Sequence, residues 1–351
     1  MSLKEALLYN KLPEGKTACF LCAHRCVISE GKFGICQTRQ NKGGSLYTYA
    51  YGGVVAANID PIEKKPLFHF LPGSKSFSIA AAGCNFHCGF CQNWQISQKK
   101  EADKSVERPV PMSPSEIVKG ALKYKCRSIS YTYTEPTIFF EYAYETARIA
   151  KEKGLLNIFV TNGYMTKEAL EMIRPYLDAA NVDLKFFNNE SYRRVCGGSL
   201  QPVMDTISLM RKLGVWVEVT TLIVPGENDS PEELKAIASF LAGVGKEIPW
   251  HISRFHPDYK MTNKDSTPLS ILKTAYKIGK DAGLRYVYIG NVPEEAWAIG
   301  SPTTALWPEE KTSCYKCQKS LLSRMGFEVI ENNLKGAACP SCGAVLDGIF
   351  A

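Results

Sequence analysis

Three cysteines in the first half of the chain have a spacing that suits one iron–sulfur cluster. Cys84, Cys88 and Cys91 are arranged as C-x3-C-x2-C, directly after an apolar run at 76–82. Thiolates are soft ligands, and three of them can hold a cubane [4Fe-4S] cluster while one iron stays open to a further ligand. The alternative is a zinc knuckle whose fourth ligand comes from elsewhere in the chain. The position after the first strand of a series favours the cluster.

Four further cysteines near the C-terminus have the spacing of a structural metal site. They form two C-x2-C pairs separated by 21 residues. Four thiolates around one ion leave no open position, so a metal here would support folding and not chemistry. The pattern is typical of a zinc ribbon or a rubredoxin-like module, and it favours zinc over iron. The predicted ligands are Cys314, Cys317, Cys339 and Cys342.

A third cysteine group lies near the N-terminus, in the order C-x2-C-x3-C-x9-C. It also offers four ligands, but its spacing fits zinc less well than that of the C-terminal group. Zinc and a [4Fe-4S] cluster both stay open for it, with zinc slightly favoured. His24 lies inside the group and is an alternative ligand. The four cysteines are Cys19, Cys22, Cys26 and Cys36.

The composition is that of a globular protein in a reducing compartment. The chain has 351 residues and 13 cysteines, and it lacks an apolar run of the roughly 20 residues that a membrane helix needs. The N-terminal sequence MSLKEALLYNKL has no apolar signal-peptide core, so we expect a cytoplasmic protein whose cysteines bind metals. The formal charge of +7 falls to about +2 once the thiolates bind their metals. The charge therefore does not indicate a nucleic-acid-binding protein.

Short apolar runs alternate with helical segments from about residue 76 to residue 290. Strands separated by helices of about 10–15 residues predict parallel βα units and an α/β fold. About six such units fit, as an open, partial (β/α)6 barrel. Ligands of such sheets bind at the carboxyl ends of the strands, where most of the motifs fall. The expected strands are 76–82, 128–133, 156–161, 181–187, 216–224, 251–255 and 284–290.

Helix starts and changes in composition divide the chain into three expected domains. Ser113 and Ser230 each precede a proline and a glutamate that can close a capping box. Residues 46–75 predict a β-hairpin, and the cysteine-rich residues before them resemble loops. Trp307-Pro308 is the expected boundary of the last module. The domains are 1–75 (four-cysteine segment and hairpin), 76–307 (α/β core) and 308–351 (four-cysteine module).

The segment CNFHCGFC at 84–91 resembles the cluster motif of the radical S-adenosylmethionine (SAM) superfamily. It is particularly similar to the activating enzymes of glycyl-radical enzymes, and the resemblance spans 76–290. This implies a radical SAM barrel and a [4Fe-4S] cluster whose open iron binds SAM. One electron, from a flavodoxin- or ferredoxin-type donor, would then cleave SAM to a 5′-deoxyadenosyl radical that abstracts hydrogen from a substrate. The three cysteines are thereby expected to be catalytic.

The same resemblance implies SAM contacts after the second strand. Thr134-Glu135-Pro136 lies where activating enzymes have a Gly-Gly-Glu-Pro motif that contacts the amino group of SAM, and Tyr133 and Thr134 replace the glycines. Phe90 matches an aromatic residue whose backbone lies near the adenine. Without the resemblance, Glu135 can be read as a helix-capping residue.

Residues after the later strands complete the implied SAM site. Asn162 matches a polar position near SAM, and Asp183 and Lys185 match a D-x-K motif whose side chains share one face of a strand. His251 matches a histidine beside the adenosine, whereas Thr220 replaces an arginine of the activating enzymes. The alternatives are an Asx-turn at Asn162 and a plain ion pair between Asp183 and Lys185.

Several further segments resemble the radical SAM member of the AmmeMemoRadiSam family over nearly the whole chain. They are TYTEPTIFFEY, VDLKFF, RFHPDYKM and YVYIGNV, together with the cysteine-rich ends. This resemblance implies AMMECR- and Memo-type partner proteins but no agreed substrate. Three functions stay open. They are hydrogen abstraction from a protein glycine, radical modification of a small molecule, lipid or nucleotide, and a non-enzymatic zinc-ribbon adaptor.

Overall fold

The computed structural model describes residues 3–98, 109–293 and 311–350, which form two compact units. The first unit comprises Met1–Asp60, Lys75–Val182 and Asn189–Val215, and the second comprises Pro61–Ser74, Asp183–Asn188 and Trp216–Ala351. The expected boundary at Trp307-Pro308 lies outside the described residues. The division into three domains stays a prediction.

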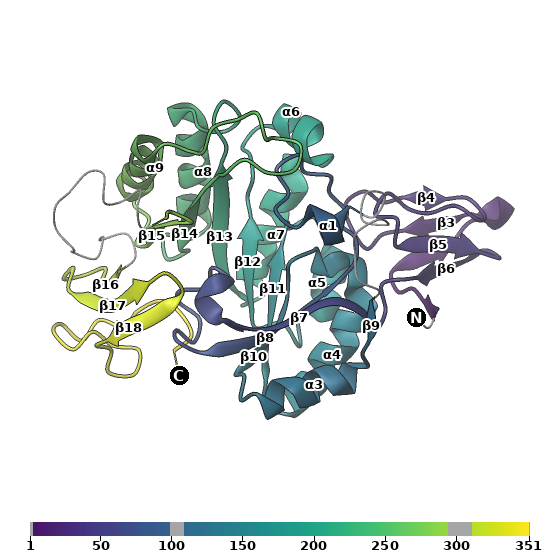
Figure 1. Cartoon of the computed structure of the whole chain (residues 1–351), viewed down its shortest axis with the longest axis horizontal. Coiled ribbons are helices and arrows are strands. Elements are labelled where there is room, and N and C mark those ends of the chain that lie inside the picture. Colours follow the sequence, from purple (N-terminus) through teal and green to yellow (C-terminus); the bar gives the residue numbers. More distant parts are fainter. Residues whose placement is uncertain (1–2, 99–108, 294–310, 351) are drawn as a thin grey trace. The chain divides into compact units, whose positions relative to one another are not determined.

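The first unit is built on strands in the order β9-β7-β8-β10-β11-β12 (Figure 1). The pairs β8–β10, β10–β11 and β11–β12 are parallel, and β7 pairs antiparallel with β9. Every residue of β10 is buried, as expected for a parallel strand covered on both faces. The bounds are β7 Gly53–Pro61, β8 Lys75–Ala81, β9 Val110–Pro111, β10 Ser128–Tyr131, β11 Leu156–Thr161 and β12 Ala179–Asp183.

Helices connect and cover these strands. α3 packs against α4, β8 and β10, and it buries Ile117 and Val118 there. Ser113 caps α3 as predicted, because the N–H of Ser113 donates to the Glu116 carboxylate at 2.7 Å and the N–H of Glu116 donates to the serine hydroxyl at 3.3 Å. With η marking 3-10 or π segments, the bounds are α1 Trp94–Ser97, α3 Pro114–Lys123, η3 Pro136–Phe139, α4 Phe140–Glu152, α5 Lys167–Ile173, α6 Asn189–Ser191, η4 Tyr192–Cys196 and α7 Leu200–Lys212.

Two small antiparallel sheets occupy the N-terminal residues, which the sequence predicts as loops. Their strand orders are β1-β6-β5 and β2-β3-β4 (purple in Figure 1). The hairpin expected within 46–75 forms earlier, between β5 and β6, where Gly43 and Gly44 have φ of 59° and 70° and make a two-residue turn. Such short strands show no alternating pattern, so the prediction missed them. The bounds are β1 Lys4–Glu5, β2 Tyr9–Lys11, η1 Pro13–Gly15, β3 Thr17–Cys19, β4 Val27–Ile28, β5 Arg39–Lys42 and β6 Ser45–Thr48.

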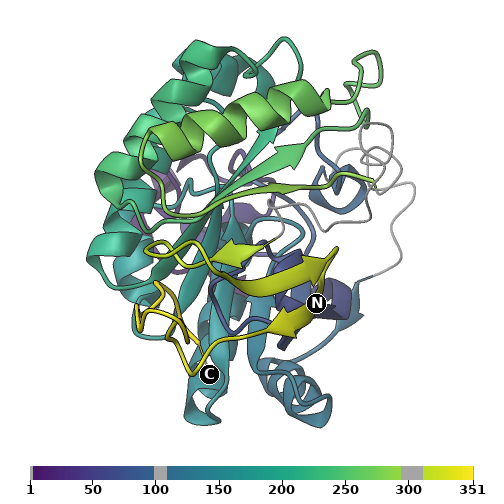
Figure 2. The ribbon, with the colours of Figure 1, turned by 90° about the vertical axis from the view of Figure 1, so that its left-hand side faces the viewer.

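The second unit holds the parallel strands β13-β14-β15. α9 packs against α8 and lies along β14 and β15 (Figure 2). Ser230 caps α8, but Glu233 does not complete the predicted capping box, because its carboxylate accepts from the N–H of Phe187 at 2.6 Å. The bounds are η2 Ile62–Lys64, β13 Trp216–Ile223, α8 Pro231–Val244, β14 Trp250–Arg254, α9 Leu269–Asp281 and β15 Val287–Gly290.

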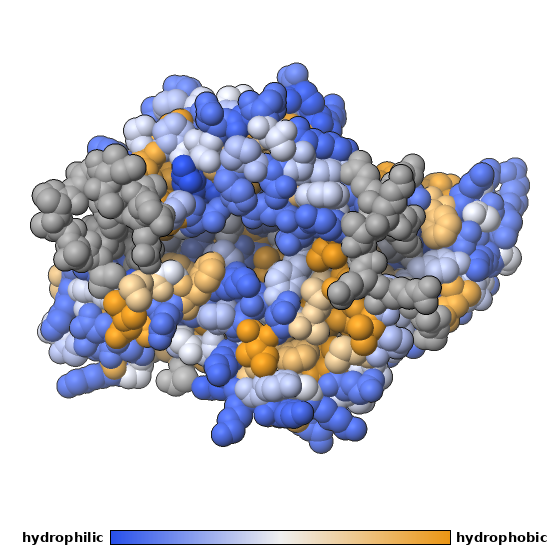
Figure 3. Space-filling view, viewed as in Figure 1, coloured by the Kyte–Doolittle hydropathy of each residue, from blue (hydrophilic) through white to orange (hydrophobic). Residues whose placement is uncertain are grey.

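The last described segment of this unit forms its own antiparallel sheet, β16-β17-β18. Its small core contains Leu321 and Leu346 around Cys314 and Cys339. On the face shown in Figure 3, apolar side chains over these strands are interspersed with polar ones, which is ordinary for a protein surface. The bounds are β16 Thr312–Ser313, β17 Ser320–Met325 and β18 Glu328–Asn332.

The α/β fold with parallel strands is confirmed, and each predicted core strand is present. The largest difference is at 181–187, where the strand begins at Ala179 and ends at Asp183, so Lys185 follows the strand. The number of barrel units stays a prediction. None of the helices in the described ranges is both long and apolar enough to cross a membrane.

Candidate functional site

The three clustered cysteines lie on the loop between β8 and α1. Backbone hydrogen bonds hold this loop against η4. The N–H of His87 donates to the carbonyl of Cys196 at 2.8 Å, and the N–H of Gly89 donates to the carbonyl of Val195 at 3.1 Å. The loop is therefore fixed at two points between its cysteines. These half-buried or buried cysteines are Cys84, Cys88 and Cys91.

Two glycines allow neighbouring segments to approach this loop closely. Gly83 has φ of 108°, and a Cβ there would lie 2.8 Å from the Cγ2 atom of Thr38. A Cβ at Gly198 would lie 2.3 Å from the ring of Phe86. A side chain at either position would force its neighbour to move. Phe90, the predicted adenine contact, is 4% exposed in the same loop.

The surroundings of the sulfurs fit a metal cluster. Burial raises the pKa of the Cys84 thiol well above its usual value, and the charges of Glu135 and of the other two cysteines raise it further. Three thiolates whose charges act on one another need a compensating cation, which a [4Fe-4S] core supplies. Two polar groups already lie at the sulfurs. The N–H of Phe86 donates to Cys84 Sγ at 3.4 Å, and the Ser97 hydroxyl lies 3.1 Å from Cys91 Sγ.

Glu135 follows β10 and ties it to the end of β11. Its Oε1 accepts from the N–H and hydroxyl of Thr137 at 3.0 and 2.5 Å and from the hydroxyl of Thr161 at 2.7 Å. Its Oε2 accepts from the N–H of Asn162 at 2.8 Å. Burial raises the pKa of this carboxyl although the hydrogen bonds lower it. Glu135 does cap η3, which begins at Pro136, and Oε2 keeps a lone pair for one further donor.

Tyr133 takes up a backbone conformation that glycine adopts at no cost. Its φ is 63°, in the left-handed region that other residues rarely occupy. The tyrosine hydroxyl donates to the carboxylate of Asp60 and accepts from the amide of Asn58 at 3.2 Å. The hydroxyl of Thr134 donates to the carbonyl of Ala81, at the end of β8, at 2.7 Å. These bonds hold the turn before Glu135 although both glycines of the related motif are replaced.

Asn162 links the end of β11 to the cysteine loop. Its Nδ2 donates to Oδ1 of Asn85 at 2.7 Å and lies 3.9 Å from Cys84 Sγ. Its Oδ1 accepts from the N–H of Tyr164 at 3.0 Å, which is the Asx-turn alternative. Because its N–H also binds Glu135, the first unit brings Cys84, Asn162 and Glu135 into one hydrogen-bonded group.

Asp183 and Lys185, predicted to contact SAM, belong to the second unit. The ammonium of Lys185 donates to Oδ2 of Asp183 at 2.7 Å, so the two side chains meet and the ion-pair alternative is realised. The carbonyl of Lys185 accepts from the amide of Asn228 at 2.7 Å, which fixes the backbone after the pair. Thr220, at the position of the missing arginine, is 9% exposed on β13.

His251, also in the second unit, binds a carboxylate that the sequence pattern did not single out. Its Nε2 lies 2.7 Å from Oε2 of Glu218, a fully buried residue of β13. Glu218 also accepts from the N–H groups of Phe68 and His69 at 2.9 and 2.8 Å. Burial raises the pKa of Glu218, but its hydrogen bonds, His251 foremost, hold that pKa below the usual range. The available signal was one acidic residue within the apolar run at 216–224.

The four C-terminal cysteines form a compact group. Their sulfurs all lie within 4.8 Å of one another, with Cys314 and Cys342 paired at 3.6 Å and Cys317 and Cys339 paired at 3.6 Å. A tetrahedral ion bonded to four sulfurs at about 2.3 Å separates those sulfurs by roughly 3.8 Å. The group therefore fits one metal ion, and the identity of that metal stays a prediction.

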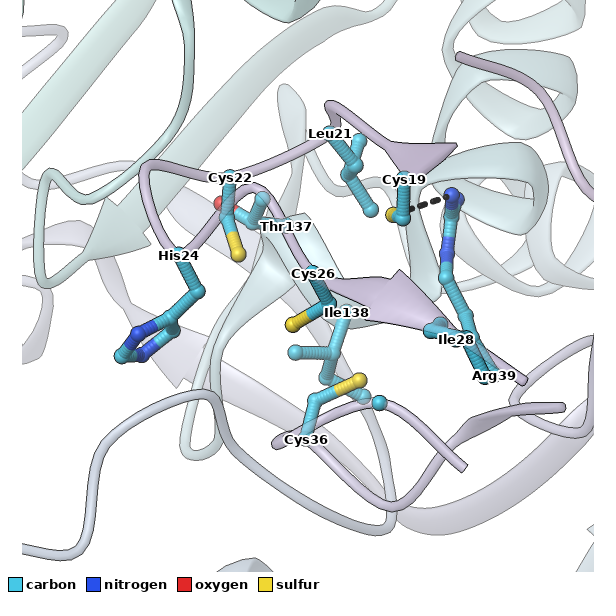
Figure 4. A pocket seen from close by; sticks show the side chains of 11 residues that line it. Cys19, Leu21, Cys22, His24, Cys26, Ile28, Cys36, Arg39, Thr137 and Ile138 are labelled. Atoms are coloured by element: carbon cyan, nitrogen blue, oxygen red, sulfur yellow. Dashed lines mark hydrogen bonds between the residues drawn. The ribbon is translucent and has the colours of Figure 1, made fainter. Parts of the chain in front are cut away.

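The four N-terminal cysteines line a small cavity in the first unit (Figure 4). They come from the end of β3, the turn after it, the residue before β4 and the loop before β5. His24 lines the same cavity, but its Nε2 donates to the carbonyl of Asn85 at 2.8 Å and is not a free ligand atom. The cysteines are Cys19, Cys22, Cys26 and Cys36.

Comparisons with known proteins give the following similarities. The family model of the radical SAM superfamily matches residues 78–241. An uncharacterized protein of Methanocaldococcus jannaschii is 43% identical over 348 residues, covering 98% of this chain and 99% of that protein. The pyruvate formate-lyase-activating enzyme of Clostridium pasteurianum is 22% identical over 199 residues, covering 51% of this chain and 79% of that enzyme. The crystal structure of Streptococcus suis SuiB matches with a TM-score of 0.50 and 14% identity, over 67% of this chain and 54% of that one, and supports the fold alone.

Proposed function

We propose that this chain, which belongs to the radical SAM superfamily, cleaves SAM with a [4Fe-4S] cluster held by Cys84, Cys88 and Cys91. The observation that carries the proposal is the loop that presents these three sulfurs and no fourth cysteine, held by two backbone hydrogen bonds to η4. When bound, the cluster supplies one electron to SAM, and the resulting 5′-deoxyadenosyl radical abstracts hydrogen from a substrate.

Residues of the first unit have defined parts in this proposal. Glu135 accepts from the amino group of SAM through the remaining lone pair of Oε2. The existing hydrogen bond from the N–H of Asn162 to Oε2 is kept. Pro136 begins η3 and so sets the direction of Glu135, while Thr134 fixes the turn before it. Asn162 joins this end of the sheet to the cysteine loop through its hydrogen bond to Asn85. By family likeness, the backbone of Phe90 is assigned to the adenine of SAM.

In the second unit, three further residues are assigned to SAM by family likeness. Asp183 acts as an acceptor for SAM groups, and Lys185 acts as a cation that already neutralises Asp183. By family likeness, His251 would lie beside the adenosine of SAM. Because Glu218 accepts from Nε2–H of His251, a neutral imidazole presents its Nδ1 atom as an acceptor. Glu218 is therefore a positioning residue for His251.

We propose further that the substrate is a protein glycine, as in activating enzymes. Support comes from the segment CNFHCGFC and from the similarity to the Clostridium pasteurianum enzyme over 51% of this chain. An electron donor of the flavodoxin or ferredoxin class, and partners of the AMMECR and Memo type, belong to the same proposal by family likeness. Zinc at the C-terminal group would give a structural module beside this activity.

Formation of 5′-deoxyadenosine tests both levels of the proposal. The protein is reconstituted and reduced without oxygen, and SAM is added with macromolecular or small-molecule fractions of a host lysate. Stimulation by the macromolecular fraction, lost after protease treatment, supports a protein substrate. Stimulation by the small-molecule fraction alone refutes the activase proposal and points to a small-molecule substrate. Absence of 5′-deoxyadenosine from protein with intact clusters contradicts SAM cleavage itself.

A further inference from the structure

We propose that the four N-terminal cysteines hold a second [4Fe-4S] cluster and not a zinc ion. The space between the sulfurs carries this inference. The cavity that they line offers about 20 Å³ to the centre of a water-sized sphere, and it lies inside the first unit (Figure 4). None of its four sulfurs is taken up in a disulfide bond. They belong to Cys19, Cys22, Cys26 and Cys36.

A closed zinc site would not leave such a space. Its centre lies about 2.3 Å from every sulfur, where a sphere of about 1.4 Å radius cannot fit beside four sulfur atoms. The N-terminal sulfurs, all in described parts of the chain, do not form a group within 4.8 Å of one another, whereas the C-terminal sulfurs do. A cubane core places four irons and four sulfides between its ligands, so it needs sulfurs that stand apart around a cavity.

The rest of the wall suits an iron–sulfur cluster. Leu21, Ile28 and Ile138 supply an apolar lining that keeps water from the sulfurs. Polar donors are aimed at the ligands themselves. The Thr38 hydroxyl donates to Cys36 Sγ at 3.2 Å, and the Arg39 guanidinium, 1% exposed, donates to Cys19 Sγ at 3.5 Å. Hydrogen bonds to cluster ligands stabilise the reduced state and so raise the reduction potential.

The cavity adjoins the loop that carries the radical-forming cysteines. Thr137 and Ile138, which follow Glu135 in η3, form part of its wall. The His24 ring, inside the cysteine group, donates to the carbonyl of Asn85, the neighbour of Cys84. A Cβ at Gly83, on the other side of Cys84, would lie 3.6 Å from the carbonyl oxygen of Cys36. The segments that carry the two cysteine groups are therefore adjacent and joined by the hydrogen bond from His24 to Asn85.

Because the two sites are adjacent, we assign the second cluster a role as an electron relay. This role rests on the proposed function. One electron enters the N-terminal cluster from a low-potential protein donor of the flavodoxin or ferredoxin class. The same electron then leaves for the cluster at Cys84, Cys88 and Cys91, so the relay returns to its oxidised state. No bond is formed or broken and no proton moves in this transfer.

Metal content of the full-length chain, isolated without oxygen, tests the site. The variant C84A/C88A/C91A removes the first cluster and leaves both four-cysteine groups intact. We expect about four iron, about four sulfide and about one zinc per chain, with an electron paramagnetic resonance signal after reduction. Absence of iron together with about two zinc per chain overturns the proposal. This result does not depend on SAM cleavage.

A pair of further variants in the same background locates the iron. Cys22→Ser with Cys26→Ser is expected to remove the remaining iron, with the C-terminal zinc and the circular dichroism spectrum retained as evidence of folding. Cys126→Ser is the matched control, because Cys126 is buried outside all three groups and should keep the iron. Iron retained after loss of Cys22 and Cys26 overturns the assignment.

The relay is tested by the rate at which the first cluster is reduced, followed by electron paramagnetic resonance without SAM. In the chain carrying Cys22→Ser and Cys26→Ser, we expect most of the rate with reduced flavodoxin to be lost. Reduction by dithionite, a small reagent that reaches the first cluster directly, should still go to completion. An unchanged rate with flavodoxin refutes the relay and leaves the metal assignment standing.

Discussion

The two four-cysteine groups have identical ligands but different surroundings. In the C-terminal group, Cys314 and Cys339 are core residues of a three-stranded sheet together with Leu321, and the sulfurs pair at 3.6 Å. The N-terminal group surrounds a cavity whose wall includes Thr137 and Ile138, from more than a hundred residues later in the chain. The C-terminal group packs with residues of its own segment, and the N-terminal group is completed by η3, which follows Glu135.

This difference teaches that the number of cysteines does not identify the cofactor. Two C-x2-C turns that face each other bring four sulfurs to one point, which suits a single ion. The x3 and x9 spacings of the N-terminal group instead spread the sulfurs around a space. The C-terminal site lies within its own segment, whereas the N-terminal site adjoins the loop of Cys84, Cys88 and Cys91.

The largest expected effect is the loss of SAM cleavage when a ligand outside both four-cysteine groups is replaced. Cys88→Ser should reduce 5′-deoxyadenosine formation to background, because it removes a ligand of the cluster that SAM cleavage requires. The C-terminal metal should stay bound at about one per chain. Chromatographic assay of the nucleoside and elemental analysis measure the two results. Normal nucleoside formation by this variant would falsify the cluster assignment.

Loss of a C-terminal ligand should have a large but local effect. Cys339→Ser is expected to unfold the sheet β16-β17-β18 if the group binds zinc as predicted, because structural zinc contributes roughly 10–16 kcal/mol of folding free energy in zinc-finger peptides. Hydrogen–deuterium exchange should rise across 311–350 while the iron content stays constant. Loss of iron from this variant would show that the two groups are not independent.

Acid should weaken the C-terminal region through His69. Its Nδ1–H donates to the carbonyl of Asp347 and its Nε2 accepts from the Tyr288 hydroxyl, so the bound ring is neutral. Burial lowers the pKa of His69 to about 4, below the ordinary value of about 6.5. Stability from the neutral ring is therefore complete above about pH 6.5 and is lost as the pH falls to 4, by about 3 kcal/mol.

Calorimetric melting between pH 7 and pH 4 measures this loss. His69→Asn removes the titrating group, so the variant should be less stable at pH 7 and should lose less of its remaining stability in acid. Parallel pH curves for the two proteins would contradict the assignment of the acid sensitivity to His69.

The smallest effects come from a matched pair of glycines. Gly83 and Gly343 both have positive φ, 108° and 70°, but a Cβ at Gly343 meets nothing within 4 Å. Gly343→Ala should cost about 1 kcal/mol, and Gly83→Ala should cost about 1–3 kcal/mol and disturb the contact with Thr38. Thermal melting and iron content measure both. Equal costs and unchanged iron would mean that the packing of Gly83 against Thr38 does not support the cysteine loop.

The parallel strands could be predicted because each is a buried apolar run between helix signals. β10 and β11 begin and end within two residues of their expected bounds. The N-terminal sheets could not, because β1 and β4 have two residues each and hold their place through distant partners. A distant residue also holds the turn after β3, since the hydroxyl of Thr166 donates to the carbonyl of Phe20 at 2.8 Å. Local sequence patterns do not predict such long-range contacts.

The candidate site shows the same limit. Spacing alone singled out the cysteines, since metal ligands need particular side chains at particular intervals. The carbonyls of Val195 and Cys196 that hold the loop could not be predicted from the sequence, because any residue can supply a backbone carbonyl. Glu233 was expected to cap its own helix, but a backbone N–H from another segment, that of Phe187, competes for its carboxylate. Tertiary partners of this kind are known only once the chain has folded.

The anchoring of the N-terminal sheets has a consequence for the order of assembly. Cys22 forms an isolated β-bridge with Met165, and the N–H of Ala23 donates to the carbonyl of Tyr164 at 2.9 Å. At about 5–20 residues per second, Met165 is synthesised roughly 7–30 s after Cys22. During this interval the first cysteines made on the ribosome lack the segment that completes their site, and their thiols are open to oxidation. Loading of this site is therefore timed by the arrival of a much later part of the chain.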